Sequence, residues 1–119
     1  MLVVWAAAGG ACGAALRYLL LASLPGLFPW VTLGINIAGS LVIGLVWGYY
    51  AEAAWFQAWG RVFWVVGVLG GFTTFSTFSY DVVTLIEQQQ VVLALGYILL
   101  SVLCCIGAAY LGWTLAKLN

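Results

Sequence analysis

The sequence contains no histidine and very few charged side chains. Only 5% of its 119 residues are charged, against roughly 25% in an ordinary soluble domain, so this chain could not present a surface to water. The absence of histidine removes the commonest general base and metal ligand, and no other nucleophile–base pair or metal-ligand set is present. We therefore expect a membrane protein that is not an enzyme.

The sequence also lacks a net charge and a pattern of paired cysteines. Three basic residues balance three acidic ones, which excludes a basic surface for nucleic acid and an acidic tail for a protein partner. The three cysteines include no CxxC pair, and an odd number gives no disulfide framework. Only two prolines occur, at positions 25 and 29, where they end the first hydrophobic run.

Long hydrophobic runs are what the sequence has in abundance. A spanning helix needs about 20 apolar residues, because a rise of ~1.5 Å per residue must cover a hydrocarbon core of ~30 Å. The first run lacks the positively charged start of a signal peptide, and we expect it to be retained. The sequence thus predicts a single all-helical integral membrane domain over residues 1–119, with four spans at about 2–24, 31–50, 61–86 and 91–116.

The charged residues give almost no preference for one orientation of these spans. With four spans, both termini and the 51–60 loop share one side of the membrane. Arg61 and Lys117 lie on that side, and Arg17 leans toward the other. A difference of about one charge barely sets topology. Two outcomes are open: insertion one way with the N-terminus inside, or insertion both ways to give an antiparallel homodimer.

Glycines four residues apart indicate where helices can pack closely. Such a spacing places hydrogen atoms on one helix face, although glycine is common in membrane helices and some pairs face lipid. The pairs are Gly9 and Gly13, Gly44 and Gly48, and Gly67 and Gly71.

The stretch GGFTTFSTFSYD at 70–81 places hydrogen-bonding side chains within the third hydrophobic run. Its glycine pair is a poor helix former, and Thr73 and Thr74 are β-branched, so the sequence favours a break near 70–75. A break frees backbone groups in a region without water, where each must find a partner. Two interpretations are open: loose carbonyls coordinate a cation, or threonine hydroxyls satisfy a simple glycine kink.

Other polar side chains share single faces of the expected helices. Thr32 and Asn36 are four residues apart on the second helix. Tyr97, Ser101 and Cys105 follow at the same spacing on the fourth. Such residues either bond across helices or line a polar route, and the pattern leaves both open.

Arg17 and two phenylalanines complete the candidates. An arginine near a helix centre costs ~2.5–3.5 kcal/mol on insertion scales, so Arg17 either reaches the headgroups or attracts anions at a vestibule. Phe75 and Phe78 share a face, where they either pack or present their electropositive ring edges to an anion. Hydroxyls, amide N–H groups and ring edges together would make a conduit rich in donors, which suits a small anion.

Three motifs closely resemble a known family. GGACGAALRY at 9–18, TLGINIAGS at 32–40 and GGFTTFSTFS at 70–79 are similar to those of the small fluoride channels called Fluc or CrcB-like proteins, and the similarity extends over all four spans. The resemblance implies a fluoride-selective channel that exports fluoride passively across the bacterial cytoplasmic (inner) membrane and so lowers its toxicity. It also implies a dual-topology, antiparallel homodimer in the lipid bilayer.

The same resemblance implies roles for individual residues. Backbone carbonyls of Gly70 and Thr73 from both chains would hold a structural sodium ion at the helix break. Fluoride would pass Phe75 and Phe78, with Arg17 at the vestibule. Two positions depart from the family, which often has glutamate at Asp81 and usually serine at Cys105. The remaining pore residues would be Asn36, Ser76, Thr77, Tyr97 and Ser101, with an outer polar track at Thr32, Asp81 and Cys105.

Two other functions are alternatives. A small proton-coupled cation or drug antiporter has a similar length, but it needs a carboxylate deep in the first helix, where this chain has Arg17 and no acid. A non-transporting membrane assembly subunit would explain the glycines and aromatic residues but not the hydroxyl-rich stretch. The sequence therefore favours the fluoride channel.

Overall fold

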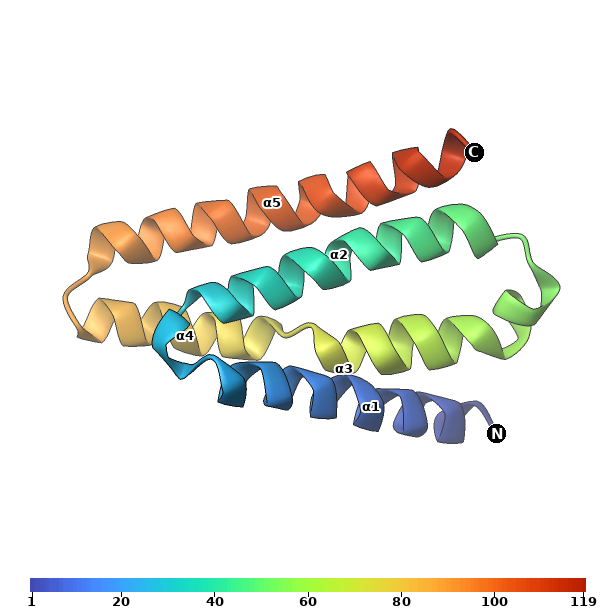
Figure 1. The fold of residues 1–119 in the computed structure, drawn as a ribbon, viewed down its shortest axis with the longest axis horizontal. Coiled ribbons are helices and arrows are strands. Elements are labelled where there is room, and N and C mark those ends of the chain that lie inside the picture. The colour runs from blue at the N-terminus through green and yellow to red at the C-terminus, as the bar shows by residue number, and fades with distance from the viewer.

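The computed structural model describes residues 1–119, which form helices joined by short connections (Figure 1). Four stretches are long and apolar enough to cross a membrane: α1, α2, a third stretch at Phe56–Glu87, and α5. The expected all-helical architecture with four spans is therefore confirmed. In chain order the elements are α1 (Leu2–Ser23), the short 3-10 helix η1 (Pro25–Leu27), α2 (Trp30–Tyr50), the π-helix η2 (Phe56–Leu69), α3 (Gly70–Phe72), α4 (Phe75–Glu87) and α5 (Val91–Lys117).

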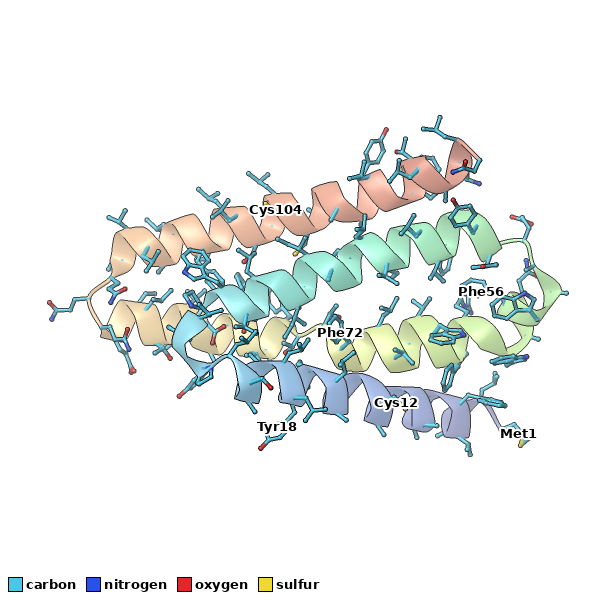
Figure 2. All side chains as sticks on the ribbon, viewed as in Figure 1. Met1, Cys12, Tyr18, Phe56, Phe72 and Cys104 are labelled. Atoms are coloured by element: carbon cyan, nitrogen blue, oxygen red, sulfur yellow. The ribbon has the colours of Figure 1, made fainter.

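The third span begins earlier than the sequence indicates. Helical conformation resumes at residue 54, so the connection expected at 51–60 is only about three residues long. No glycine or proline precedes Gly60 in this segment, and the side chain of Phe56 is 1% exposed. The Phe56 side chain, labelled in Figure 2, lies edge-on to Trp47, with ring centroids 6.0 Å apart. Aromatic packing against α2 therefore draws this segment into the span.

Spans that follow one another in the chain run antiparallel, as the short connections require, whereas the most tightly packed pairs, α2 with α5 and α1 with η2, run parallel (Figure 1). In Figure 1, α5, α2, the third stretch and α1 follow one another across the molecule, and both termini lie at the same end as the connection after α2. The tightest pairings are α2 with α5, and α1 with η2 and α3. The third stretch also contacts α5 through α4, so α5 is shared between two neighbours.

Glycines let the paired helices approach backbone to backbone. A Cβ atom at Gly13 on α1 would collide with the carbonyl oxygen of Val68 on η2. A Cβ at Gly44 on α2 would collide with the carbonyl oxygen of Ala109 on α5. Packing of this kind holds membrane helices together where no hydrophobic effect acts between them.

Most apolar side chains point away from the protein interior. Only 20 of the 119 residues are buried, and large side chains such as Leu103 on α5 are exposed. Tyr18 on α1 points away from the other helices (Figure 2). An exterior this apolar must be covered by lipid or by another protein surface. The small core centres on Tyr97, which contacts Phe78 and Leu85 of α4.

Candidate functional site

The helical backbone of the third stretch is interrupted at Thr73 and Thr74. Both residues are extended, with φ −79° and ψ 155° at Thr73 and φ −152° and ψ 121° at Thr74. The ribbon is uncoiled between α3 and α4 (Figure 1). Gly70 and Gly71, in contrast, stay helical. A Cβ at Gly71 would meet the Gly10 carbonyl oxygen, so this glycine serves packing against α1.

Asn36 on α2 holds Thr74 by both of its backbone groups. The Asn36 Nδ2 donates a hydrogen bond to the Thr74 carbonyl oxygen at 3.0 Å. The Thr74 N–H donates to Asn36 Oδ1 at 2.8 Å. Asn36 therefore bonds across helices to the interruption, while it also lines the cavity described below.

Threonine hydroxyls satisfy further groups at the interruption. The Thr74 hydroxyl caps α4 by accepting from the Thr77 N–H at 3.1 Å. The same hydroxyl donates to Thr77 Oγ1 and lies 3.2 Å from Ser76 Oγ. The Thr73 hydroxyl donates to the Leu69 carbonyl oxygen at 2.8 Å. Ser76 and Thr77 thus belong to the cap of α4.

This bonding removes the usual donors of two backbone carbonyls. In a continuous α-helix, the carbonyl of residue i accepts from the N–H of residue i+4. The donor for Gly70 would be Thr74, and the donor for Thr73 would be Thr77. Those two N–H groups bond to Asn36 and to the Thr74 hydroxyl instead. The carbonyls of Gly70 and Thr73 therefore lack the donors of a continuous helix and need another partner.

The two phenylalanines of the first α4 turn have different surroundings. Their ring centroids are 5.3 Å apart. Phe78 is buried and its ring centroid lies 5.2 Å from that of Tyr97 on α5. Phe75 is 76% exposed, so its ring projects from the chain toward lipid, an ion or a partner surface.

A cavity of about 400 Å³ opens beside the interruption, between α2, η2, α4 and α5. The Ser101 hydroxyl is buried in its wall and has no hydrogen-bond partner. A buried hydroxyl without a partner is a donor available to a ligand. The residues singled out from the sequence that line this cavity are Asn36, Gly70, Thr73, Phe75, Phe78, Ser101 and Cys105.

Three other candidates form a separate buried cluster. The Tyr97 hydroxyl donates to Asp81 Oδ2 at 3.0 Å. Thr32, Asp81 and Tyr97 are all buried, at 3%, 4% and 0% exposure. A carboxyl group this deep requires a polar partner, which Tyr97 supplies. These residues lie outside the cavity wall, so the structure divides the expected polar track into two parts.

Arg17 is placed apart from both groups. It lies on α1, is half-buried, and is not among the residues of the cavity wall. Its Nε is buried without a hydrogen-bond partner. Arg17 therefore retains a donor that its own chain does not use.

Sequence reasoning missed two residues of α2. Ser40 lines the cavity, and a Cβ at Gly39 would collide with the methyl group of Thr73. The signal for Ser40 was present, because it follows Asn36 by four residues and so shares its helix face. Together these features define a small integral membrane protein whose third span is interrupted beside a cavity with polar groups in its wall.

Comparison with known proteins identifies the family. A family model described as "CrcB-like protein, Camphor Resistance (CrcB)" matches residues 4–113. The chain therefore belongs to the CrcB-like family, and the resemblance drawn from its three motifs is confirmed. Membership also confirms that it is a multi-pass membrane protein and not an enzyme.

Individual relatives match over nearly their whole length. The "Fluoride-specific ion channel FluC" of Magnetococcus marinus is 41% identical over 122 residues, which cover 99% of each chain. The protein of the same name from Hahella chejuensis is 40% identical and covers 98% of this chain and 94% of its own. That from Nitrobacter winogradskyi is 44% identical over 110 residues, with coverage of 89% and 87%.

Proposed function

We propose that this chain is a fluoride-specific ion channel. The observation that carries the proposal is the full-length identity of about 40% to relatives named for that activity. The channel would let fluoride leave a bacterial cell passively, across the cytoplasmic membrane and down its own gradient. Its effect would be to lower the toxicity of accumulated fluoride.

The donors around the cavity support a small anion as the permeant ion. An asparagine amide has two N–H groups. Asn36 donates one of them to the Thr74 carbonyl oxygen, so the second is available to a ligand. The unpartnered Ser101 hydroxyl and the exposed ring of Phe75 add further positive hydrogens. Donors of this kind replace the water that fluoride loses on entry. Arg17 would raise the local anion concentration at a vestibule.

We further propose that the functional unit is a dual-topology, antiparallel homodimer in the lipid bilayer. The apolar exterior and the exposed Phe75 support a partner surface next to the interruption. The nearly balanced charges support insertion in both orientations. In the dimer the third spans would be broken near the middle of the bilayer.

A structural sodium ion fits the carbonyls that the interruption frees. The oxygens of Gly70 and Thr73 lack the N–H donors of a continuous helix, and unwound carbonyls are typical sodium ligands in membrane proteins. Two antiparallel chains would supply four such oxygens on their symmetry axis. The sodium ion would hold the two interruptions together, and this chain's part is to orient the carbonyls.

The outer route past the phenylalanines would use the remaining polar residues. Ser76 and Thr77 lie at the start of α4, and Cys105 lines the cavity on α5. The cluster of Thr32, Asp81 and Tyr97 lies farther along α4, where the Asp81 carboxyl is tied to Tyr97. We propose that this cluster fixes α4 against α5 beside the pore.

Purified protein in liposomes tests the proposed function. Vesicles loaded with fluoride, and matched vesicles loaded with chloride, are given a potassium gradient and valinomycin, and efflux is followed with ion-selective electrodes. The proposal expects fluoride to leave quickly and chloride to stay. Equal release of both ions, or of neither, would refute it. Fluoride efflux that needs a proton gradient would contradict passive conduction. Proton-coupled movement of an organic cation without fluoride flux would favour the antiporter, and a protein that moves neither would favour the assembly subunit.

A further inference from the structure

The side chain of Asn36 is committed to the backbone of a single residue. It donates to the Thr74 carbonyl oxygen at 3.0 Å and accepts from the Thr74 N–H at 2.8 Å. These two groups belong to consecutive peptide units, because the N–H lies before the Thr74 Cα and the carbonyl lies after it. Each peptide unit is planar, so fixing both units fixes φ and ψ at Thr74. One side chain on α2 thus determines the backbone geometry of a residue on the third stretch.

Thr74 is the residue from which α4 starts. Its hydroxyl caps the helix by accepting from the Thr77 N–H, and Phe75 is the next residue in the chain. The direction of α4, and with it the positions of Phe75 and Phe78, depends on how the peptide units of Thr74 are turned. A small rotation there would move the Phe75 ring, which nothing else in the chain buries.

The neighbouring turn of α2 is fitted to the same interruption. A Cβ at Gly39 would collide with the Thr73 methyl group, so α2 approaches the extended segment closely one turn after Asn36. The bond between Asn36 and the Thr74 N–H also takes that donor away from the Gly70 carbonyl. Asn36 therefore contributes to three features of the interruption: its extended shape, the start of α4 and a free carbonyl.

We infer that Asn36 is a positioning residue, which acts on ion passage through Thr74. Its paired hydrogen bonds hold the interruption in one geometry and so place the phenylalanines of α4 beside α5. The inference rests on the proposed function only in that fluoride flux is one of its readouts. It differs from a role for Asn36 as a direct ion contact, which would not require the Thr74 bonds.

The first experiment uses Asn36→Leu, which keeps the branching and the number of non-hydrogen side-chain atoms and removes both hydrogen bonds. Fluoride efflux from liposomes should fall by about tenfold or more, because the site is no longer held in position. Exchange of the Thr74 amide hydrogen, followed by NMR on protein labelled with ¹⁵N-threonine, should speed up by about tenfold, because that amide loses its partner. Thr84→Ala is the control, since it removes one hydrogen bond, to the Tyr80 carbonyl, farther along α4 and away from the interruption. Its flux and Thr74 exchange should stay unchanged.

A second variant keeps the test decisive if Asn36→Leu does not fold. Asn36→Asp keeps an oxygen for the Thr74 N–H but loses the donor for the Thr74 carbonyl. The Thr74 amide should then remain protected while fluoride efflux falls. Fast Thr74 exchange in Asn36→Asp would contradict the inference, because the bond to Oδ1 would not be what protects that amide.

A double-mutant comparison tests whether Asn36 and the Thr74 hydroxyl act through the same interruption. Thr74→Ala removes the hydroxyl that caps α4 and should slow fluoride efflux by itself. If both residues act on one interruption, the double variant should be slower than the worse single variant by no more than about twofold. Effects that multiply would show independent action and overturn the inference. So would a loss of flux in Asn36→Leu with an unchanged Thr74 amide, or fast Thr74 exchange with unchanged flux.

The failure of the inference can be told from the failure of the proposed function. If the parent protein releases no fluoride, the channel proposal fails. The amide measurement still reports whether Asn36 holds Thr74. If the parent conducts and Asn36→Leu conducts equally well, the channel proposal stands and the positioning role is wrong.

Discussion

Replacing Tyr97 by phenylalanine removes one oxygen from the centre of the fold. The ring of Tyr97 is fully buried and lies 5.2 Å from that of Phe78, so the smaller side chain should keep this packing. What disappears is the hydrogen bond to Asp81 Oδ2, which measures 3.0 Å. The substitution therefore isolates the polar part of the contact between α4 and α5.

The expected cost follows from the burial of Asp81. A hydrogen bond to a charged group contributes roughly 1.5–3 kcal/mol, and the loss is largest where the remaining partner is cut off from water. Asp81 is 4% exposed, so water cannot replace the tyrosine hydroxyl without a local opening. We expect Tyr97→Phe to lower the free energy of unfolding by about 2 kcal/mol.

Unfolding in mixed micelles of mild detergent and SDS, followed by tryptophan fluorescence, measures this cost. The same substitution in an Asp81→Asn background is the control, because the uncharged amide depends less on the hydroxyl. There we expect a cost of about 1 kcal/mol, typical of a neutral hydrogen bond. An equal cost in both backgrounds would show that the hydroxyl acts elsewhere. A cost below about 0.5 kcal/mol would show that the bond is not formed.

Three further predictions concern the ions and the helix packing. Phe75→Ile or Phe78→Ile should slow fluoride efflux by roughly tenfold or more, because an aliphatic side chain has no electropositive ring edge. Circular dichroism checks folding, and an efflux rate equal to the parent's in both variants would refute the ring-edge role. Exchange of sodium for a much larger monovalent cation during purification should weaken the dimer in size-exclusion chromatography, because the freed carbonyls would lose an ion of the right size. An unchanged dimer and unchanged fluoride efflux would contradict the sodium proposal. Gly44→Ala should destabilise the fold by about 1–3 kcal/mol, since its Cβ would meet the Ala109 carbonyl oxygen. Gly107→Ala should not, because a Cβ there has open space around it, and equal effects of the two variants on the unfolding midpoint would refute this packing argument.

Hydropathy was sufficient to predict four spans because lipid imposes a length and an apolar composition on any helix that crosses it. The start of the third span was harder to predict. Residues 54–60 carry no strong breaker, and the burial of Phe56 against Trp47 depends on how two helices meet. Such a contact is tertiary, and periodicity within one segment does not reveal it.

The interruption shows the same division between local and tertiary information. Composition favoured a break near 70–75, but the glycine pair remains helical and the extended residues are the threonines after it. Gly71 is needed where α1 comes close, and Thr74 is held by Asn36 from a distance of 38 positions in the chain. The sequence contained both residues of that pair, but their contact depends on the register of α2 against the third stretch.

The sequence predicted which residues belong to the candidate site, but not which of them lie together. Spacing placed Tyr97, Ser101 and Cys105 on one face of α5, the motif at 32–40 supplied Asn36, and the stretch at 70–81 supplied Asp81. The structure separates these residues into a cavity wall and a buried cluster, because Tyr97 turns its hydroxyl to α4. A hydroxyl whose single proton is donated to a neighbouring helix cannot donate that proton to a permeant ion, and a helical repeat does not show which way the hydroxyl points.

The polar groups near the interruption fall into those used by the fold and those left over. In an apolar environment each polar group needs a partner, so the groups that bond within the chain build the scaffold. Most of the hydrogen-bonding groups of Thr74, Thr77 and Asn36 bond to one another. The groups left over include the second N–H of Asn36, the hydroxyl donor of Ser101 and the carbonyl acceptors of Gly70 and Thr73. Donors suit an anion and carbonyls suit a cation. The bonds made by Asn36 and Thr74 would thus shape one interruption that offers donors to the proposed fluoride route and carbonyls to the proposed sodium site.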